Sequence, residues 1–244
     1  MTNADTPQMA TVTIGDTTAE LPLVAGTEGV PSVDFSSFTK QTGHTSLDYG
    51  FVNTASTKSS ITYIDGDQGI LRYRGYPIEQ LAQHSTYLEV AWLLLYGELP
   101  TADELAGWDE KIRRHTLLHE DLKHFFSALP HTAHPMSVLS AATAALSTYY
   151  EGQSDPHNPE HVELNTIRML AKLPVIAAYA HKKSIGHAFL YPDNSLSFVD
   201  NFLKLNFGNN AEPYEINPVM SRALERLLIL HADHEQNAST STVR

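Results

Sequence analysis

Helix-start signals recur along this sequence from Pro77 onward, and they constrain its fold more than any other feature. In a capping box, a Thr side chain and a Glu three residues later bind each other's backbone N–H groups. An Asn before a proline likewise places a capping side chain ahead of the favoured first helical residue. The signals are Thr86-x-x-Glu89, Thr101-x-x-Glu104, Asn158-Pro159 and Asn217-Pro218. They predict a mainly α body that continues to the end of the chain.

The apolar spacing predicts how far some of these helices extend. After Thr86, apolar residues recur at helical spacing until Gly97, which fits a left-handed helix cap. The helix that starts after Asn158 should run to about Leu173 and stop at Pro174, because proline disrupts a helix interior. The helix after Asn217 is expected to bury one face, formed by Leu224, Leu227, Leu228 and His231.

The N-terminal region follows the strand period instead. Residues 10–14 and 19–23 alternate apolar and polar side chains around the turn signal Gly15-Asp16, which indicates a β hairpin. Residues 32–60 are rich in Ser, Thr and Gly and are expected to form an extended surface segment. A second hairpin is expected from residues 61–64 and 69–73, turning at Asp65-Gly66-Asp67-Gln68-Gly69. We therefore expect a small antiparallel β region, residues 1–60, before a helical domain, residues 61–244.

Charge and composition exclude several classes of function. The net charge of −12 repels nucleic-acid phosphates and anionic lipid, which argues against nucleic-acid binding as the main function. The chain has no cysteine and hence no disulfide or thiolate nucleophile. Its first residues lack the features of a secretory signal, and its apolar runs are too short to span a bilayer. We expect a soluble, cytoplasmic protein.

The densest polar cluster lies at residues 230–237. His231 and His234 share a helix face, and Asp233 and Glu235 flank the second imidazole. A charged imidazole there could hold a substrate carboxylate. Alternatively, these side chains only satisfy carbonyls at a helix end. A metal site is not expected, because the order His-x-x-His-Glu differs from the zincin pattern His-Glu-x-x-His.

A small basic cluster lies within this acidic chain at Arg113-Arg114-His115-Thr116, with His119 close behind. On a helix these side chains would suit a phosphate group, or they would form an ordinary solvated helix end. No glycine-rich nucleotide loop accompanies them.

Long blocks of the sequence resemble the citrate synthase family. Residues 64–78 (IDGDQGILRYRGYPI) resemble the opening block of these enzymes, and residues 230–241 (LHADHEQNASTS) resemble their oxaloacetate-binding segment. His134-Pro135-Met136 and residues 212–218 (EPYEINP) fit the same family between them. The N-terminal hairpin region is similar to that of the hexameric bacterial form.

The resemblance implies a mostly helical homodimer or homohexamer that condenses oxaloacetate with acetyl-coenzyme A to citrate, an acyltransferase reaction without metal or cofactor. It places His234 on an oxaloacetate carboxylate, with His231 and Asn237 beside it. The family's catalytic histidines lie in Gly-Pro-x-His-Gly-Gly and Gly-x-Gly-His-Arg segments, which this sequence lacks. We therefore expect no catalytic residue in this chain, which corresponds to an N-terminal part of the enzyme and should be inactive alone.

In the hexameric form NADH acts as an allosteric inhibitor at a separate basic site. The resemblance carries that site onto Arg114, His115, Thr116, Tyr150, Arg168 and Lys172. Several alternatives stay open: the chain is a piece of a longer protein or a short protein, it forms a dimer or a hexamer, and NADH control is retained or lost. The activity could also be that of a 2-methylcitrate synthase, which uses propionyl-coenzyme A, and a non-catalytic helical NADH-binding or assembly module is the alternative of a different class.

Overall fold

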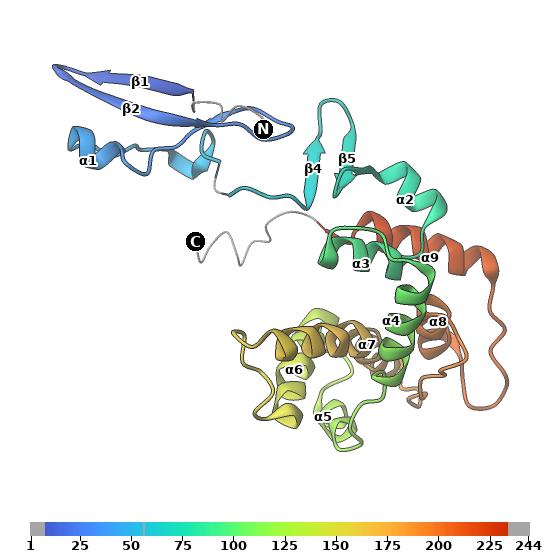
Figure 1. The fold of residues 1–244 in the computed structure, drawn as a ribbon. Coiled ribbons are helices and arrows are strands. Elements are labelled where there is room, and N and C mark those ends of the chain that lie inside the picture. The colour runs from blue at the N-terminus through green and yellow to red at the C-terminus, as the bar shows by residue number, and fades with distance from the viewer. Residues whose placement is uncertain (1–7, 56, 234–244) are drawn as a thin grey trace. The chain divides into compact units, whose positions relative to one another are not determined.

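The computed structural model describes residues 8–55 and 57–233. The chain divides into two compact units, residues 1–70 and 71–244. The border lies ten residues beyond residue 60, where the sequence analysis places the end of the β region. Figure 1 shows the strands near the N-terminus and mostly helices after them, so the predicted fold class, mainly α with a small antiparallel β part, is confirmed.

The N-terminal unit is built on the predicted hairpin. Strands β1 and β2 pair antiparallel, and Ile14 lies opposite Thr17 across the two-residue loop. Gly15 opens that loop at a φ of 56°, which favours glycine. The elements up to the border are β1 (Met9–Ile14), β2 (Thr17–Val24), β3 (Ser32–Val33), α1 (Phe38–Thr42), the 3-10 helix η1 (Tyr49–Phe51) and β4 (Thr62–Asp65).

The prediction of an extended segment over residues 32–60 is wrong in part. Strand β3 pairs with the end of β2, and α1 follows it. Phe38 is buried against Ala19 and Leu21, which gives this unit its own small core. The expectation missed α1 because a five-residue helix carries too little periodicity to identify it in sequence.

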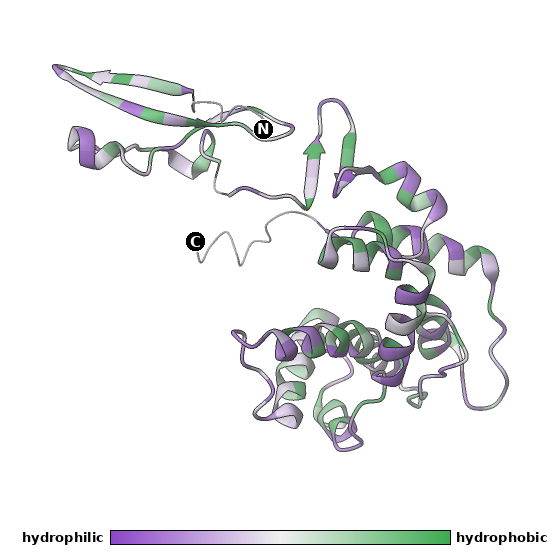
Figure 2. Ribbon diagram, viewed as in Figure 1, coloured by the Kyte–Doolittle hydropathy of each residue, from purple (hydrophilic) through white to green (hydrophobic). Residues whose placement is uncertain are grey.

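The larger unit is helical. Its elements are β5 (Ile70–Tyr73), β6 (Tyr76–Pro77), α2 (Ile78–His84), α3 (Tyr87–Tyr96), α4 (Ala102–Arg114), α5 (Leu122–Ala128), α6 (Pro135–Ser147), the 3-10 helix η2 (Thr148–Tyr150), α7 (Pro159–Ser184), α8 (Phe198–Phe207) and α9 (Pro218–Leu230). Helix α3 is apolar along most of its length (Figure 2). In residues 8–55 and 57–233 no helix has the length and hydropathy of a membrane crossing.

The predicted helix starts are confirmed. Thr86 and Glu89 form a complete capping box, in which the Thr86 N–H donates to the Glu89 carboxylate at 2.6 Å. Thr101 and Glu104 form the second box at the start of α4. The side chains of Asn158 and Asn217 accept N–H bonds at the starts of α7 and α9. Gly97 ends α3 in the left-handed conformation, as predicted.

The predicted end of α7 is wrong. The helix passes through Pro174 and continues to Ser184. Proline has no N–H to donate to the carbonyl four residues earlier, which disfavours a helix interior. The residues after Pro174 outweigh that loss because they are deeply buried in the core, Ile176 and Tyr179 at 0% and 2% exposure.

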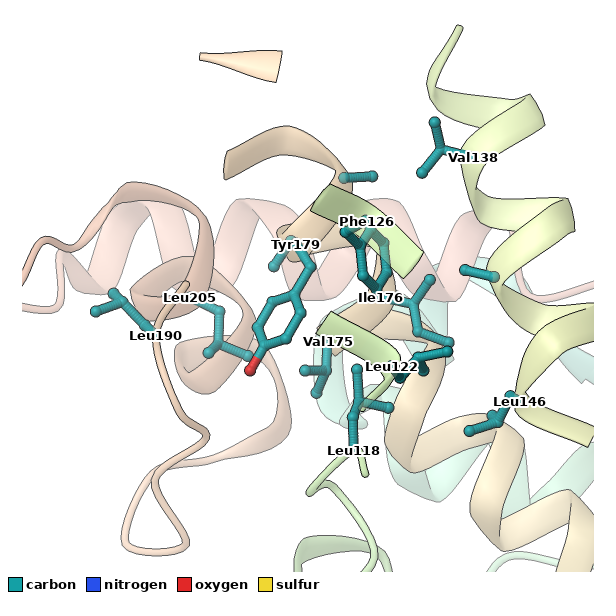
Figure 3. Packing of buried hydrophobic residues seen from close by; sticks show 13 residues of the cluster. Leu118, Leu122, Phe126, Val138, Leu146, Val175, Ile176, Tyr179, Leu190 and Leu205 are labelled. Atoms are coloured by element: carbon teal, nitrogen blue, oxygen red, sulfur yellow. The ribbon is translucent and has the colours of Figure 1, made fainter. Parts of the chain in front are cut away.

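The main core of the helical unit joins α5, α6, α7 and α8. Phe126 packs edge-on against Tyr179, and the Tyr179 ring stacks on Phe189 with centroids 4.4 Å apart. Figure 3 shows Tyr179, Val175 and Ile176 from α7 amid leucines of the neighbouring segments. Two further clusters hold α3 between α2 and α9 on one side and α4 and α7 on the other.

Candidate functional site

Helix α9 leads into the polar cluster at residues 230–237. The packing of α9 against its neighbours therefore decides where that cluster lies. The predicted buried face of α9 is wrong in part, because Leu224 and Leu228 are half-buried but Leu227 and His231 are exposed. Ile229 is fully buried, whereas the Leu227 side chain is 53% exposed and His231 is exposed. Ile229 packs with Tyr73, Leu93 and their neighbours. The face of α9 that contains Ile229 is therefore buried, rather than the face that the leucine spacing indicated.

Two charged side chains on α9 also bind the ends of neighbouring helices. The Arg222 guanidinium donates to the carbonyls of Ala82, Gln83 and Ser85 at the end of α2. One turn later, the Glu225 carboxylate accepts the Tyr87 N–H at the start of α3. Burial is the main influence on Glu225 and raises its pKa. Because helix ends carry unpaired carbonyl and N–H groups of opposite partial charge, each side chain has the sign its helix end favours.

His231 caps the C-terminal end of α9. Its Nδ1 lies 2.7 Å from the Leu227 carbonyl oxygen. A carbonyl only accepts hydrogen bonds, so Nδ1 carries a proton and the ring orientation is fixed. This contact is the helix-end role considered for the cluster, and it directs the other ring nitrogen, Nε2, away from the Leu227 carbonyl.

The segment after His231 is held by Tyr73. The Tyr73 hydroxyl lies 3.4 Å from the Leu230 carbonyl oxygen and 3.2 Å from that of Asp233. The Asp233 N–H also points to this hydroxyl, at 3.4 Å. Burial raises the pKa of Tyr73, so its hydroxyl stays protonated and able to donate. His234 and Asn237, the other predicted oxaloacetate ligands, lie outside the described residues.

Sequence reasoning missed Tyr73, Arg222 and Glu225. The signal for the two charged residues was present, since they lie three apart on α9 and interrupt its apolar pattern. Tyr73 lies inside the block that carries the family resemblance, but its partners are distant in sequence and only the fold brings them to it.

The second predicted site, for a nucleotide, is partly assembled around α7. The Arg168 guanidinium lies 4.0 Å above the Tyr150 ring, and the Lys172 ammonium lies 6.0 Å from it. Lys172 is buried, donates to the His115 carbonyl at 2.6 Å and also binds the Leu117 carbonyl. Burial, helped by the nearby Arg168 charge, lowers the pKa of Lys172 to about 8.

The remaining predicted members of this site lie in and after α4. Arg114 pairs with Glu110 at 2.5 Å on the surface. The Thr116 hydroxyl donates to the Arg113 carbonyl, and His115 Nδ1 bonds the Lys111 carbonyl. The structure therefore brings Tyr150, Arg168, Lys172 and the His115 backbone together, while the Arg114 guanidinium is engaged with its own helix.

Comparison with known proteins identifies the family. The sequence model for the citrate synthase C-terminal domain matches residues 50–244. Citrate synthase 1 of Mycobacterium tuberculosis is 59% identical over 241 residues, covering 99% of this chain and 56% of that protein. Citrate synthase of Corynebacterium glutamicum is 51% identical, covering 92% of this chain and 52% of the relative. This chain thus spans about half the length of these curated relatives.

A solved structure agrees with this assignment. Citrate synthase from the archaeon Thermoplasma acidophilum, in a ternary complex with carboxymethyl coenzyme A and oxaloacetate, superposes with a TM-score of 0.72 at 26% identity. The superposition covers 80% of this chain and 50% of the archaeal one. With a family match over most of its length and a matching fold, this chain belongs to the citrate synthase family.

Proposed function

We propose that this chain is part of an enzyme that condenses acetyl-coenzyme A with oxaloacetate to give citrate and free coenzyme A. The match of residues 50–244 to the citrate synthase family carries this proposal. The relatives from M. tuberculosis and C. glutamicum are both named citrate synthases, which favours acetyl over propionyl transfer.

Within that enzyme, this chain supplies part of the oxaloacetate site. His234 holds a carboxylate of the dianionic substrate, with His231 and Asn237 beside it. The fixed His231 ring supports this arrangement, since its Nδ1 contact orients the imidazole at the end of α9. A dianion at this position favours charged imidazole and strengthens the hydrogen bonds to it.

The reaction also requires a base for the acetyl methyl proton and donors for the developing enol oxygen. The sequence motifs that supply these groups in the family are absent from residues 1–244. We therefore assign this chain the binding of oxaloacetate, and the proton transfers to residues of the full-length enzyme outside it.

The test is an assay of thiol release by the full-length protein, with oxaloacetate and either acetyl- or propionyl-coenzyme A. We expect the higher kcat/KM with acetyl-coenzyme A, and no turnover by the 244-residue chain alone. A preference for propionyl-coenzyme A would identify a 2-methylcitrate synthase, and an inactive full-length protein would contradict the proposal.

We also propose that the protein assembles as a homodimer or homohexamer. Helix α7 and the loop before it line an open, mainly apolar groove of about 470 Å³, which includes Val162, Met169 and Leu173. Met136 at the start of α6 is also 62% exposed. Apolar surface of this kind is typical of subunit interfaces. Light scattering after size exclusion tests it, and a monomer would contradict it.

We further propose that NADH binds where Arg168, Lys172 and Tyr150 meet, with His115 and Thr116 nearby and Arg114 at the edge. The buried Nε of Arg168 has no hydrogen-bond partner among the described residues, so one N–H donor of this guanidinium is unused. Arg114 is 72% exposed and would have to exchange Glu110 for a phosphate. Breaking the Arg114–Glu110 pair costs little free energy because surface ion pairs are weak.

A further inference from the structure

We propose that Tyr73 is a positioning residue for oxaloacetate binding: its hydroxyl fixes the turn that joins α9 to His234. This role rests on the proposed function, since it concerns how the oxaloacetate ligands are held. Tyr73 itself is not a substrate ligand. It acts on residues 230–233, which come directly before His234 in the chain.

The ring and the hydroxyl of Tyr73 have separate roles. The ring is fully buried and packs with Leu81, Val90 and Ile229. A phenylalanine ring would fill the same space, so packing does not account for the hydroxyl. A buried tyrosine hydroxyl normally has a hydrogen-bond partner, and the partners in the described part of the chain are backbone groups at the end of α9.

These backbone groups would otherwise be poorly satisfied. The last carbonyls of a helix have no partner within it, and Leu230 is the final residue of α9. The single proton of the Tyr73 hydroxyl is shared between the Leu230 carbonyl, at 3.4 Å, and the Asp233 carbonyl, at 3.2 Å, and the same oxygen accepts the Asp233 N–H. Both ends of the turn therefore bind one oxygen atom, which fixes the direction in which the chain leaves α9.

The hydroxyl itself is held in place by a tight hairpin. Tyr73 pairs with Tyr76 across a two-residue turn, and Arg74 and Gly75 both have positive φ, 51° and 88°. Two successive positive φ values are the mark of a type I′ hairpin turn, which fixes strand register. The Arg74 guanidinium also donates to the Leu94 carbonyl at 2.8 Å and fastens the turn to α3.

The contact of the Tyr73 hydroxyl with the end of α9 should affect the binding of oxaloacetate and not that of the coenzyme A thioester. A ligand side chain that is displaced by a fraction of an ångström loses both affinity and orientation. Loss of the hydroxyl should therefore raise the oxaloacetate KM by roughly fivefold, the equivalent of one net hydrogen bond. The coenzyme A thioester KM should stay the same, because the partners of the hydroxyl within residues 8–55 and 57–233 lie in the segment that precedes His234.

The experiment compares Tyr73→Phe with Tyr179→Phe in the full-length protein. Tyr179 is also buried, but its ring belongs to the cluster around Phe126 and Phe189. We expect only Tyr73→Phe to raise the oxaloacetate KM, and only that variant to speed amide exchange at residues 230–233. A lower melting temperature with both KM values unchanged would make Tyr73 merely structural and overturn the inference.

The outcome for the unsubstituted protein separates this inference from the proposed function. If that protein neither binds nor condenses oxaloacetate, the proposed function is wrong and the positioning role falls with it. If it is active and Tyr73→Phe changes both substrates' KM equally, the proposed function stands and the selective role of Tyr73 is refuted.

Discussion

Arg222 and Glu225, one turn apart on α9, bind the end of α2 and the start of the next helix, α3. A single helix face thus joins three helices through two side chains of opposite charge. The same helix is capped by His231. The packing of α9 therefore also places the segment that we propose binds oxaloacetate, and variants of Arg222 and Glu225 test that packing.

Replacing Arg222 with Met should destabilise the helical unit by about 2 kcal/mol, because several carbonyls at the end of α2 lose a charged donor. Denaturant unfolding measures this change. Arg226→Met is the matched control, since Arg226 is exposed one turn further along α9. Equal stabilities for the two variants would show that the Arg222 contacts contribute nothing.

Glu225→Gln should alter how stability depends on pH. Burial raises the pKa of Glu225 above its usual value of 4.5, so the folded protein holds a proton that the unfolded chain has lost. Stability from this group is thus highest at acid pH and falls as pH rises through the folded pKa. The variant lacks this loss, so its stability should increase relative to that of the wild type as the pH rises above about 4.5.

Unfolding curves across that range measure the difference between Glu225→Gln and the wild type. Glu110→Gln removes a negative charge at an exposed position and is the control. A constant difference at every pH would mean that Glu225 is not perturbed by burial.

Lys172→Met should change stability at alkaline pH. The pKa of Lys172 is about 8 in the folded protein against a usual 10.5, so the unfolded chain binds more protons between these values. Stability from this group therefore rises with pH across that window. The neutral amine still donates to the His115 and Leu117 carbonyls.

The wild type should thus gain stability relative to Lys172→Met as pH rises from about 8 to about 10.5. Thermal melts at fixed ionic strength follow the change. Lys111→Met, at an exposed position of α4, should keep a constant difference from the wild type. The same constancy for Lys172→Met would rule out a depressed pKa.

Arg114→Leu tests the proposed NADH site. A charge-assisted bond to phosphate contributes roughly 1.5–3 kcal/mol, so losing it should weaken NADH inhibition by about tenfold or more. The oxaloacetate KM should not change. Lys111→Leu removes a neighbouring exposed cation of α4 and serves as the control. Inhibition that is equally strong in both variants and the wild type would place the site elsewhere.

The sequence predicted where helices begin better than where they end. The capping side chains at Thr86, Thr101, Asn158 and Asn217 act within one turn, so the residues that decide each start are adjacent in sequence. The extension of α7 beyond Pro174 depends instead on burial of Ile176 and Tyr179 against α5 and α6, which no local pattern shows.

The same distinction holds at the candidate site. The polar cluster after α9 was visible in sequence, but the buried face of α9 was not. Leucine spacing favoured Leu227, whereas contacts with Tyr73, Tyr87 and the end of α2 select the face with Arg222 and Ile229. Those partners lie more than one hundred residues earlier in the chain.

The most direct test of the account is the oxaloacetate KM of His234→Gln in the full-length protein. Glutamine retains hydrogen-bonding groups but cannot carry the positive charge that favours a carboxylate. We predict a higher oxaloacetate KM, a lower kcat and an unchanged acetyl-coenzyme A KM. Unchanged kinetics for both substrates, with only a lower melting temperature, would contradict the assignment of this segment to oxaloacetate.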